Sequence, residues 1–273
     1  MELIAATRVA KAQTRANEAR PYASRITSVI EDLAKGGASA SHPLLEAPDE
    51  IRKVAYVVIA GDRGLAGPYN STVIRAAERE LMARTAEGID YSLILIGKKA
   101  RDYFTFRNYA VDAFYEGITD TPHYDSAREV AEYVSEQFID GDIDQVILIF
   151  TEFVSIGTQK LAVRQFLPLE SVETIAEVGS GGELTAEFEF EPSADGVLES
   201  LLPRYVESRL YSALLDASAS EHANRQRAMK AATDNAEDLI TKLSRRLSSA
   251  RQAAITTEIM EIVGGAEALG GGD

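Results

Sequence analysis

The sequence has no cysteine and only three histidines in 273 residues. The absence of cysteine excludes disulfides, thiolate nucleophiles and cysteine-ligated metals. His42, His123 and His222 do not stand at a spacing typical of metal ligands. No G-x-S-x-G motif is present either, so no nucleophile for covalent catalysis is evident. The sequence therefore predicts no catalytic site, no metal site and no cofactor.

The sequence is also poor in basic residues relative to acidic ones. Lysine and arginine together number 28 against 43 aspartates and glutamates, which gives a formal net charge of −15. Such a chain is not expected to bind nucleic acid through a broad electrostatic footprint. Long apolar runs are also missing, since none reaches the ~18 residues that a transmembrane helix needs, and the first residues lack the apolar core of a signal peptide. We therefore expect no direct membrane insertion, while docking on a membrane complex stays open.

Both ends of the chain have the pattern of a long helix with one small or apolar seam. In residues 1–35 the seam positions alternate steps of four and three, and they are Ala5, Val9, Ala12, Ala16, Ala19, Ala23, Ile26, Ile30 and Leu33. In residues 193–269 the seam positions are Met229, Ala232, Ala236, Leu239, Leu243, Leu247, Ala250 and Ala254. This spacing is typical of a coiled coil, and the simplest packing pairs the two helices antiparallel. We expect Pro21 to bend or locally break the first helix, and Pro203 to begin or kink the last one.

The middle of the chain, residues 51–191, alternates short β-rich runs with helical stretches. The expected strands are 53–60, 91–96, 111–115, 145–150, 160–167 and 184–190. The expected helices between them are 69–85, 98–107 and 124–138, and a glycine-rich turn is expected at 179–182. This alternation predicts an α/β domain with a mostly parallel sheet and helices on both faces.

A glycine-rich stretch, GDRGLAGPYN (residues 61–70), follows the first expected strand. Many α/β proteins hold a phosphate at such a turn. Here, however, the glycines are spaced G-x-x-G-x-x-G rather than G-x-G-x-x-G, and no G-K-[ST] ends the motif. The sequence favours a tight turn with Pro68 near the first position of a helix. Asp62 and Arg63 are expected to be exposed, either as solvated residues or as contacts to a neighbouring protein.

The last helix carries basic residues in an otherwise acidic chain: Arg225, Arg227, Lys230, Lys242, Arg245, Arg246 and Arg251. They form either an ordinary solvated helix face or a set of contacts to acidic loops of a partner. The pairs Glu221–Arg225 and Asp238–Lys242 fit the first interpretation, because they have the i,i+4 spacing of helical ion pairs. Spacing alone does not decide between the two.

Five stretches resemble the γ subunit of F-type ATP synthases: MKAATDNAEDLI (229–240), ARQAAITTEIMEIVGGAEAL (250–269), GDRGLAGPYN, RYVESRLY (204–211) and MELIAATRVAKAQ. Together they cover essentially the whole chain in order. The resemblance implies a Rossmann-like α/β domain, with a mostly parallel sheet, between N- and C-terminal helices that form an antiparallel coiled coil. Family members usually continue the first helix before the position of Met1 and have cysteine at the position of Ala66. We therefore expect a first helix without its usual start, and a loop that works without cysteine.

The resemblance also implies partner contacts. Arg251 and Gln252 resemble residues of the upper shaft that hydrogen-bond to the β subunit, and Thr256 is a nearby candidate. Arg225 resembles a second basic contact to an acidic β loop. Arginine–carboxylate pairs suit such contacts, because they are directional and can still break as a shaft turns.

For the 61–70 loop, the resemblance implies a place beside the shaft, where Asp62, Arg63 and Gly64 contact the β loops that grip the rotor. The implied function is that of a central-stalk rotor inside a hexamer of α and β subunits. Proton flow through the membrane c-ring turns its foot, which carries a small ε partner. ATP and Mg²⁺ then belong to β, and the chain is a peripheral protein at the cytoplasmic face of a bacterial membrane.

Two other functions are weighed against the rotor. A Rossmann-type enzyme with helical extensions would bind a nucleotide at the end of the first strand, and it predicts an intact phosphate loop and a catalytic cluster. A coiled-coil scaffold unrelated to rotation predicts no specific match at the C-terminal end. The sequence lacks the features that the first requires, and it contains the match that the second excludes.

Overall fold

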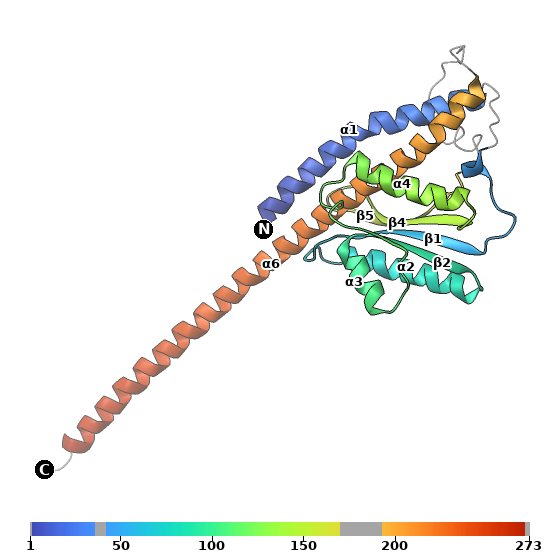
Figure 1. The fold of residues 1–273 in the computed structure, drawn as a ribbon. Coiled ribbons are helices and arrows are strands. Elements are labelled where there is room, and N and C mark those ends of the chain that lie inside the picture. Colours follow the sequence, from blue (N-terminus) through green and yellow to red (C-terminus); the bar gives the residue numbers. More distant parts are fainter. Residues whose placement is uncertain (1, 36–41, 170–192, 271–273) are drawn as a thin grey trace. The chain divides into compact units, whose positions relative to one another are not determined.

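The computed structural model describes residues 2–35, 42–169 and 193–270 (Figure 1). The expected strand at 184–190 and the expected turn at 179–182 lie outside these residues. The chain divides into two compact units, residues 1–227 and residues 228–273. The first unit contains the sheet and most of the helices, and the second is described separately below.

The first unit is built on a five-stranded sheet with the order β3-β2-β1-β4-β5. Its strands are β1 (Lys53–Ile59), β2 (Asp90–Ile96), β3 (Ala113–Tyr115), β4 (Gln145–Phe153) and β5 (Gln159–Leu167). The first four pair in parallel, whereas β5 runs antiparallel to β4. The predicted mostly parallel sheet is therefore confirmed. The fourth strand is three residues longer than predicted, because it continues to Phe153 and forms a hairpin with β5.

Helices cover both faces of this sheet, as expected for strand–helix alternation (Figure 1). One face carries α2 (Tyr69–Ala86) and α3 (Lys98–Phe106). The other carries α4 (Tyr124–Ile139) and the helices at the two ends of the unit, α1 (Glu2–Lys35) and the first part of α6 (Ala194–Gly270). A short 3₁₀ helix, η1 (Pro43–Leu45), precedes β1.

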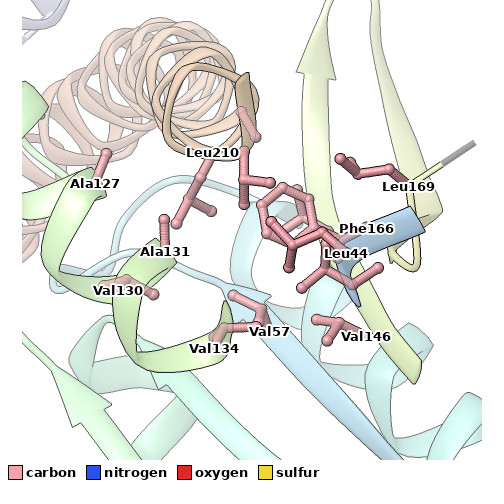
Figure 2. Close-up of a cluster of buried hydrophobic side chains, with 14 of the residues drawn as sticks. Leu44, Val57, Ala127, Val130, Ala131, Val134, Val146, Phe166, Leu169 and Leu210 are labelled. Carbon is pink, nitrogen blue, oxygen red and sulfur yellow. The ribbon is translucent and has the colours of Figure 1, made fainter. Parts of the chain in front are cut away.

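Strand β1 separates two hydrophobic cores because its side chains alternate between the faces. Val54, Tyr56 and Val58 pack with α2 and α3 in one cluster. Ala55, Val57 and Ile59 belong to the other, which also takes in α4, α1 and α6. Figure 2 shows part of this second cluster, with Leu210 of α6 among the labelled side chains. The sheet is thus buried on both faces, as a parallel sheet requires.

Helix α1 packs along the first part of α6 with the opposite direction (Figure 1). All nine seam positions predicted on α1 are buried or half-buried, and six of them are at most 6% exposed. Ile26, Ile30 and Leu33 share a cluster with buried leucines of α6 at 198, 202 and 210. The antiparallel pairing of the terminal helices is therefore confirmed for this part of α6.

Of the alternatives predicted for the two prolines, a break of the first helix at Pro21 and a start of the last helix at Pro203 are contradicted, whereas a bend or a kink is not. Helix α1 is continuous through Pro21 and is not broken there. Helix α6 does not begin at Pro203, because it starts nine residues earlier at Ala194 and contains the proline. Both prolines are exposed, and apolar residues on the opposite side of each helix are buried. This burial offsets the one backbone hydrogen bond that each proline removes.

The second unit is helical over residues 228–270, the last part of α6. Its predicted seam is largely exposed in the chain, with Leu239 at 56%, Leu243 at 52% and Leu247 at 72%. The pairing of the terminal helices is thus seen along the first part of α6, where α1 buries its seam within the first unit. Among the described residues, no helix is both long and apolar enough to cross a membrane.

Candidate functional site

The carboxyl ends of β1 and β4 are the place where an open α/β sheet usually binds a ligand. In the order β3-β2-β1-β4-β5, the chain leaves β1 toward β2 on one side and later returns to β4 on the other. Such a switch of direction opens a crevice at the strand ends. The 61–70 loop follows β1 at this point, so its side chains decide what the crevice can hold.

Asp62 occupies the position that an anion would take at the start of α3. Its carboxylate accepts hydrogen bonds from the backbone N–H of Lys98 at 3.0 Å, from the N–H of Gly117 at 3.0 Å and from the hydroxyl of Thr119 at 3.1 Å. Lys98 is the first residue of α3, so the carboxylate also faces the positive end of that helix. Asp62 was predicted to be exposed, but it is half-buried, because it holds three segments together.

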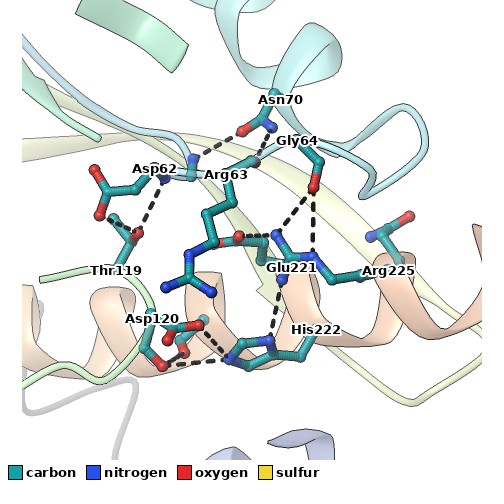
Figure 3. A network of polar contacts seen from close by, with 12 residues as sticks. Asp62, Arg63, Gly64, Asn70, Thr119, Asp120, Glu221, His222 and Arg225 are labelled. Atoms are coloured by element: carbon teal, nitrogen blue, oxygen red, sulfur yellow. Dashed lines mark hydrogen bonds and ion pairs between the residues drawn. The ribbon is translucent and has the colours of Figure 1, made fainter. Parts of the chain in front are cut away.

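Two backbone N–H groups at the start of the loop are likewise engaged within the chain. The N–H of Gly61 donates to Asn70 Oδ1 at 2.7 Å, and Asn70 Nδ2 donates to the carbonyl of Arg63 at 3.1 Å (Figure 3). The N–H of Asp62 donates to Thr119 Oγ1 at 3.3 Å. A phosphate-binding loop leaves such N–H groups free for its ligand. The prediction of a tight turn rather than a phosphate loop agrees with this geometry.

Helix α6 fills the crevice itself. The carboxyl group of Glu221 packs so closely on Gly61 that a Cβ at residue 61 would lie 2.8 Å from Glu221 Cδ. One residue before, Ser220 donates from its hydroxyl to the carbonyl of Thr151 in β4 at 3.1 Å. Both α6 residues are at most 2% exposed. Buried residues of α6 therefore occupy the ends of β1 and β4, where an open α/β sheet usually binds its ligand.

Arg225 lies in a buried network with its neighbours on α6 (Figure 3). Its guanidinium forms an ion pair with Glu221. It also donates from Nε and Nη2 to the carbonyl oxygen of Gly64, each at 3.4 Å. The predicted Glu221–Arg225 pair is confirmed, but it is buried and not solvated, since the two side chains are 2% and 11% exposed. Burial raises the pKa of Glu221, and the charge of Arg225 opposes that rise. The second predicted pair, Asp238–Lys242, is not among the ion pairs of the described residues.

The exposed part of the loop is its tip. Arg63 and Gly64 are exposed, and Leu65 is 67% exposed with a left-handed φ of 60°. A non-glycine residue held in this region is strained and often marks a functional segment. The tip borders a mostly apolar cavity of about 320 Å³ whose lining also includes Ile4 and Arg8 of α1. Leu65 was missed in the sequence because only its backbone conformation and exposure set it apart.

The other three predicted contact residues belong to the second unit. Arg251, Gln252 and Thr256 are all exposed on α6. Gln252 and Thr256 share one face of the helix because they are four residues apart. The two groups of predicted residues thus lie in different units, and each presents at least one exposed arginine. Among the described residues, no cluster of three or more potential metal ligands is present.

The sequence comparisons agree along the whole chain. The family model described as ATP synthase matches residues 1–269. The "ATP synthase gamma chain" of Kineococcus radiotolerans is 47% identical over 273 residues, which cover 98% of this chain and 90% of the relative. This chain belongs to the ATP synthase γ family. The γ chain of Frankia casuarinae is 48% identical, covering all of this chain and 92% of that protein.

Solved structures support the same fold for this γ-family chain. The central stalk/c-ring structure of the Tetrahymena thermophila mitochondrial ATP synthase contains a chain that matches with a TM-score of 0.64 and 23% identity, over 85% of this chain and 97% of that one. A chain of the Euglena gracilis mitochondrial ATP synthase matches with a TM-score of 0.60 and 19% identity, over 97% and 95%. The expected mostly parallel sheet between two terminal helices is therefore the fold of these ATP synthase chains.

Proposed function

We propose that this chain is the central-stalk rotor of a proton-translocating F-type ATP synthase. It would couple proton flow through the membrane ring mechanically to the cycling of the catalytic β subunits. The observation that carries this proposal is the γ-family match over residues 1–269 in a chain whose sheet crevice is filled by its own helix. A filled crevice suits a subunit that transmits motion and leaves ATP chemistry to its partners.

The packing of the first unit supports a mechanical role. A rotor must carry torque without bending, and α1 and α6 share a continuous buried core with the sheet. The Arg8–Asp120 ion pair adds a polar tie between α1 and the segment before α4. Close packing of this kind is stiff, because side chains interdigitate with few voids.

The proposed partners follow from the exposed residues. Arg251, Gln252 and Thr256 would contact β along the shaft. Arg63 and Gly64 at the loop tip would contact the β loops that grip the rotor. Asp62 and Arg225 would act mainly through the loop, because their side chains are engaged within the chain. The α and β subunits would surround the shaft, and ε and the c-ring would bind the sheet domain at the cytoplasmic face of the membrane.

Reconstitution with matching α and β subunits tests this function. We expect a stable assembly with azide-sensitive ATPase activity. The double substitution Arg251→Ala with Gln252→Ala is expected to weaken assembly or turnover about tenfold, which corresponds to ~1.4 kcal/mol of lost contact. Arg79→Ala serves as the control, because Arg79 is an exposed arginine on α2 outside the proposed contacts. No association with α and β, or an equal effect of the control, would contradict the proposal.

The nucleotide-binding alternative has its own test. Calorimetric titration of the isolated chain with Mg-ATP is expected to give no binding heat, because Asn70, Thr119 and Glu221 already occupy the loop and the crevice. Saturable binding that is lost on loop substitution would support an enzyme instead.

A further inference from the structure

His222 is buried on α6 at the point where three segments of the first unit meet. The residue is 2% exposed. Its Nε2 lies 3.2 Å from the backbone carbonyl of Asp120, in the segment between β3 and α4, and 3.6 Å from Asp120 Oδ1. Its Nδ1 lies 3.2 Å from Nη1 of Arg225 on the next turn of α6. The ring therefore bridges Arg225 and Asp120 (Figure 3).

The partners of the ring fix where its proton lies. An arginine guanidinium has only donors and keeps its charge at any ordinary pH. The contact with Arg225 therefore requires an unprotonated Nδ1 that accepts. The single ring proton is then on Nε2, where it donates to the carbonyl of Asp120. In this arrangement the ring is neutral and its tautomer is set by its neighbours.

The charges around His222 come from three elements. Arg225, paired with Glu221, faces it from α6. Arg8 faces it from α1, and the carboxylate of Asp120 faces it from the preceding segment. Burial is the largest influence and lowers the pKa of His222, and both arginines lower it further, whereas the carbonyl and carboxylate of Asp120 raise it. The same carboxylate is paired with Arg8.

We propose that His222 is an acid-sensitive latch that holds Arg225, and through it the tip of the 61–70 loop, in place. Protonation places an N–H on Nδ1 directly opposite the N–H of Arg225, which replaces an attraction by a repulsion. Arg225 must then move. Its hydrogen bonds to Gly64 connect the latch to the tip of the 61–70 loop. Acidification is thus expected to release Arg225 and loosen the loop and the adjoining cavity wall, while Nε2 still donates to the carbonyl of Asp120.

The direction of the effect follows from proton linkage. Because the folded chain disfavours protonation of His222, the unfolded chain binds this proton more tightly. The stabilisation is complete above the ordinary histidine pKa of about 6.5 and is lost progressively as the pH falls below it. A ring that stays neutral in the folded chain raises the unfolding equilibrium constant about tenfold between pH 7.5 and pH 5.5.

Urea unfolding of the full chain at these two pH values tests the latch. His222→Gln keeps a donor for the carbonyl of Asp120 and cannot titrate. The change in its unfolding equilibrium constant between the two pH values is therefore expected to be about tenfold smaller than that of the parent chain. His123→Gln is the matched control, because His123 is exposed, and it is expected to behave like the parent. The proposal is overturned if His222→Gln shows the same pH dependence as the parent.

A second measurement follows the opening itself. The chain has no cysteine, so Ala5→Cys introduces a single thiol at a position of α1 that is 2% exposed and borders the Arg225 cavity. Thiol labelling at pH 5.5 is expected to be faster with His222 present than in the His222→Gln background. Equal rates at this pH in the two backgrounds would contradict the latch. The comparison at one pH cancels the chemistry of the thiol.

The parent chain provides a test that needs no variant. Ring ¹⁵N chemical shifts at pH 7.5 are expected to show an unprotonated Nδ1 and a protonated Nε2 for His222. A doubly protonated ring, or a proton on Nδ1, would refute the arrangement on which the latch depends.

Discussion

The close approach of Gly61 to Glu221 gives a sharp quantitative prediction. Gly61→Ala adds a Cβ that would lie 2.8 Å from Cδ and 2.9 Å from both carboxylate oxygens of Glu221. The end of a glutamate can usually swing away at little cost. Here it cannot, because the carboxyl group is 2% exposed and paired with Arg225.

Two known effects set limits on the loss of unfolding free energy that Gly61→Ala is expected to cause. Forcing one extra methyl group into a packed interior costs about 1–3 kcal/mol. Breaking a buried ion pair, with one charge left unpaired, costs about 3–5 kcal/mol. Gly61→Ala displaces the pair without removing either charge, so we expect a loss of about 2–3 kcal/mol in the free energy of unfolding. For a unit of this size, such a loss lowers the melting temperature by about 4–12 °C.

Urea denaturation of the full chain measures this loss. Two further variants test whether the loss comes from the contact between residue 61 and Glu221. Gly64→Ala is the control, since a Cβ there meets only Lys99 Cε at 4.0 Å. In a Glu221→Asp background the shorter side chain withdraws the carboxylate, so Gly61→Ala is expected to cost at most half as much. The reasoning fails if Gly61→Ala costs no more than Gly64→Ala, or if its cost is unchanged in the Glu221→Asp background.

Two further predictions concern carboxylates of the first unit. Asp62→Ala leaves the N–H groups of Lys98 and Gly117 without their acceptor, and it is expected to cost about 1–3 kcal/mol of unfolding free energy in urea denaturation, whereas Asp62→Asn, which keeps an oxygen acceptor, is expected to cost less. Burial raises the pKa of Asp216 to about 6. The protonated carboxyl group of Asp216 therefore contributes most to stability at pH values below its ordinary pKa, and this contribution is lost as the pH rises through about 6. Asp216→Asn is accordingly expected to stabilise the chain by about 1–2 kcal/mol at pH 7, and the gain should disappear near pH 4; a gain that persists at pH 4 would contradict this assignment.

The sheet and its helices could be predicted because their pattern is local. The apolar run at 54–60 and the glycine-rich loop after it already mark β1 and its turn. The alternatives of a break at Pro21 and a start at Pro203 failed for a physical reason: a proline removes one hydrogen bond, whereas the continuity of the helix depends on the burial of its other side. Four α6 residues spaced by four, Leu198, Leu202, Val206 and Leu210, are completely buried and hold the helix through Pro203.

The site was less predictable, because its residues come from distant parts of the chain. The i,i+4 spacing of Glu221 and Arg225 indicates an ion pair, but it does not tell whether the pair faces water or protein. Asp62 looked like an exposed turn residue until its partners at Lys98, Gly117 and Thr119 were placed around it. His222 carried no motif at all, and only its burial between Arg225 and Asp120 distinguishes it from the other two histidines.

The antiparallel packing of α1 on α6 also constrains how the chain is made. Ile26, Ile30 and Leu33 are translated well before Leu198, Leu202 and Leu210, with which they share their cluster. Contacts between residues so far apart in sequence form late in folding. The entropy cost of closing the long loop between them must be met before the contacts stabilise the chain. During synthesis the apolar face of α1 therefore lacks its α6 partners until residues 198–210 have been translated. For that interval α1 keeps apolar surface exposed, and its packing against α6 is completed only after the first part of α6 has been translated.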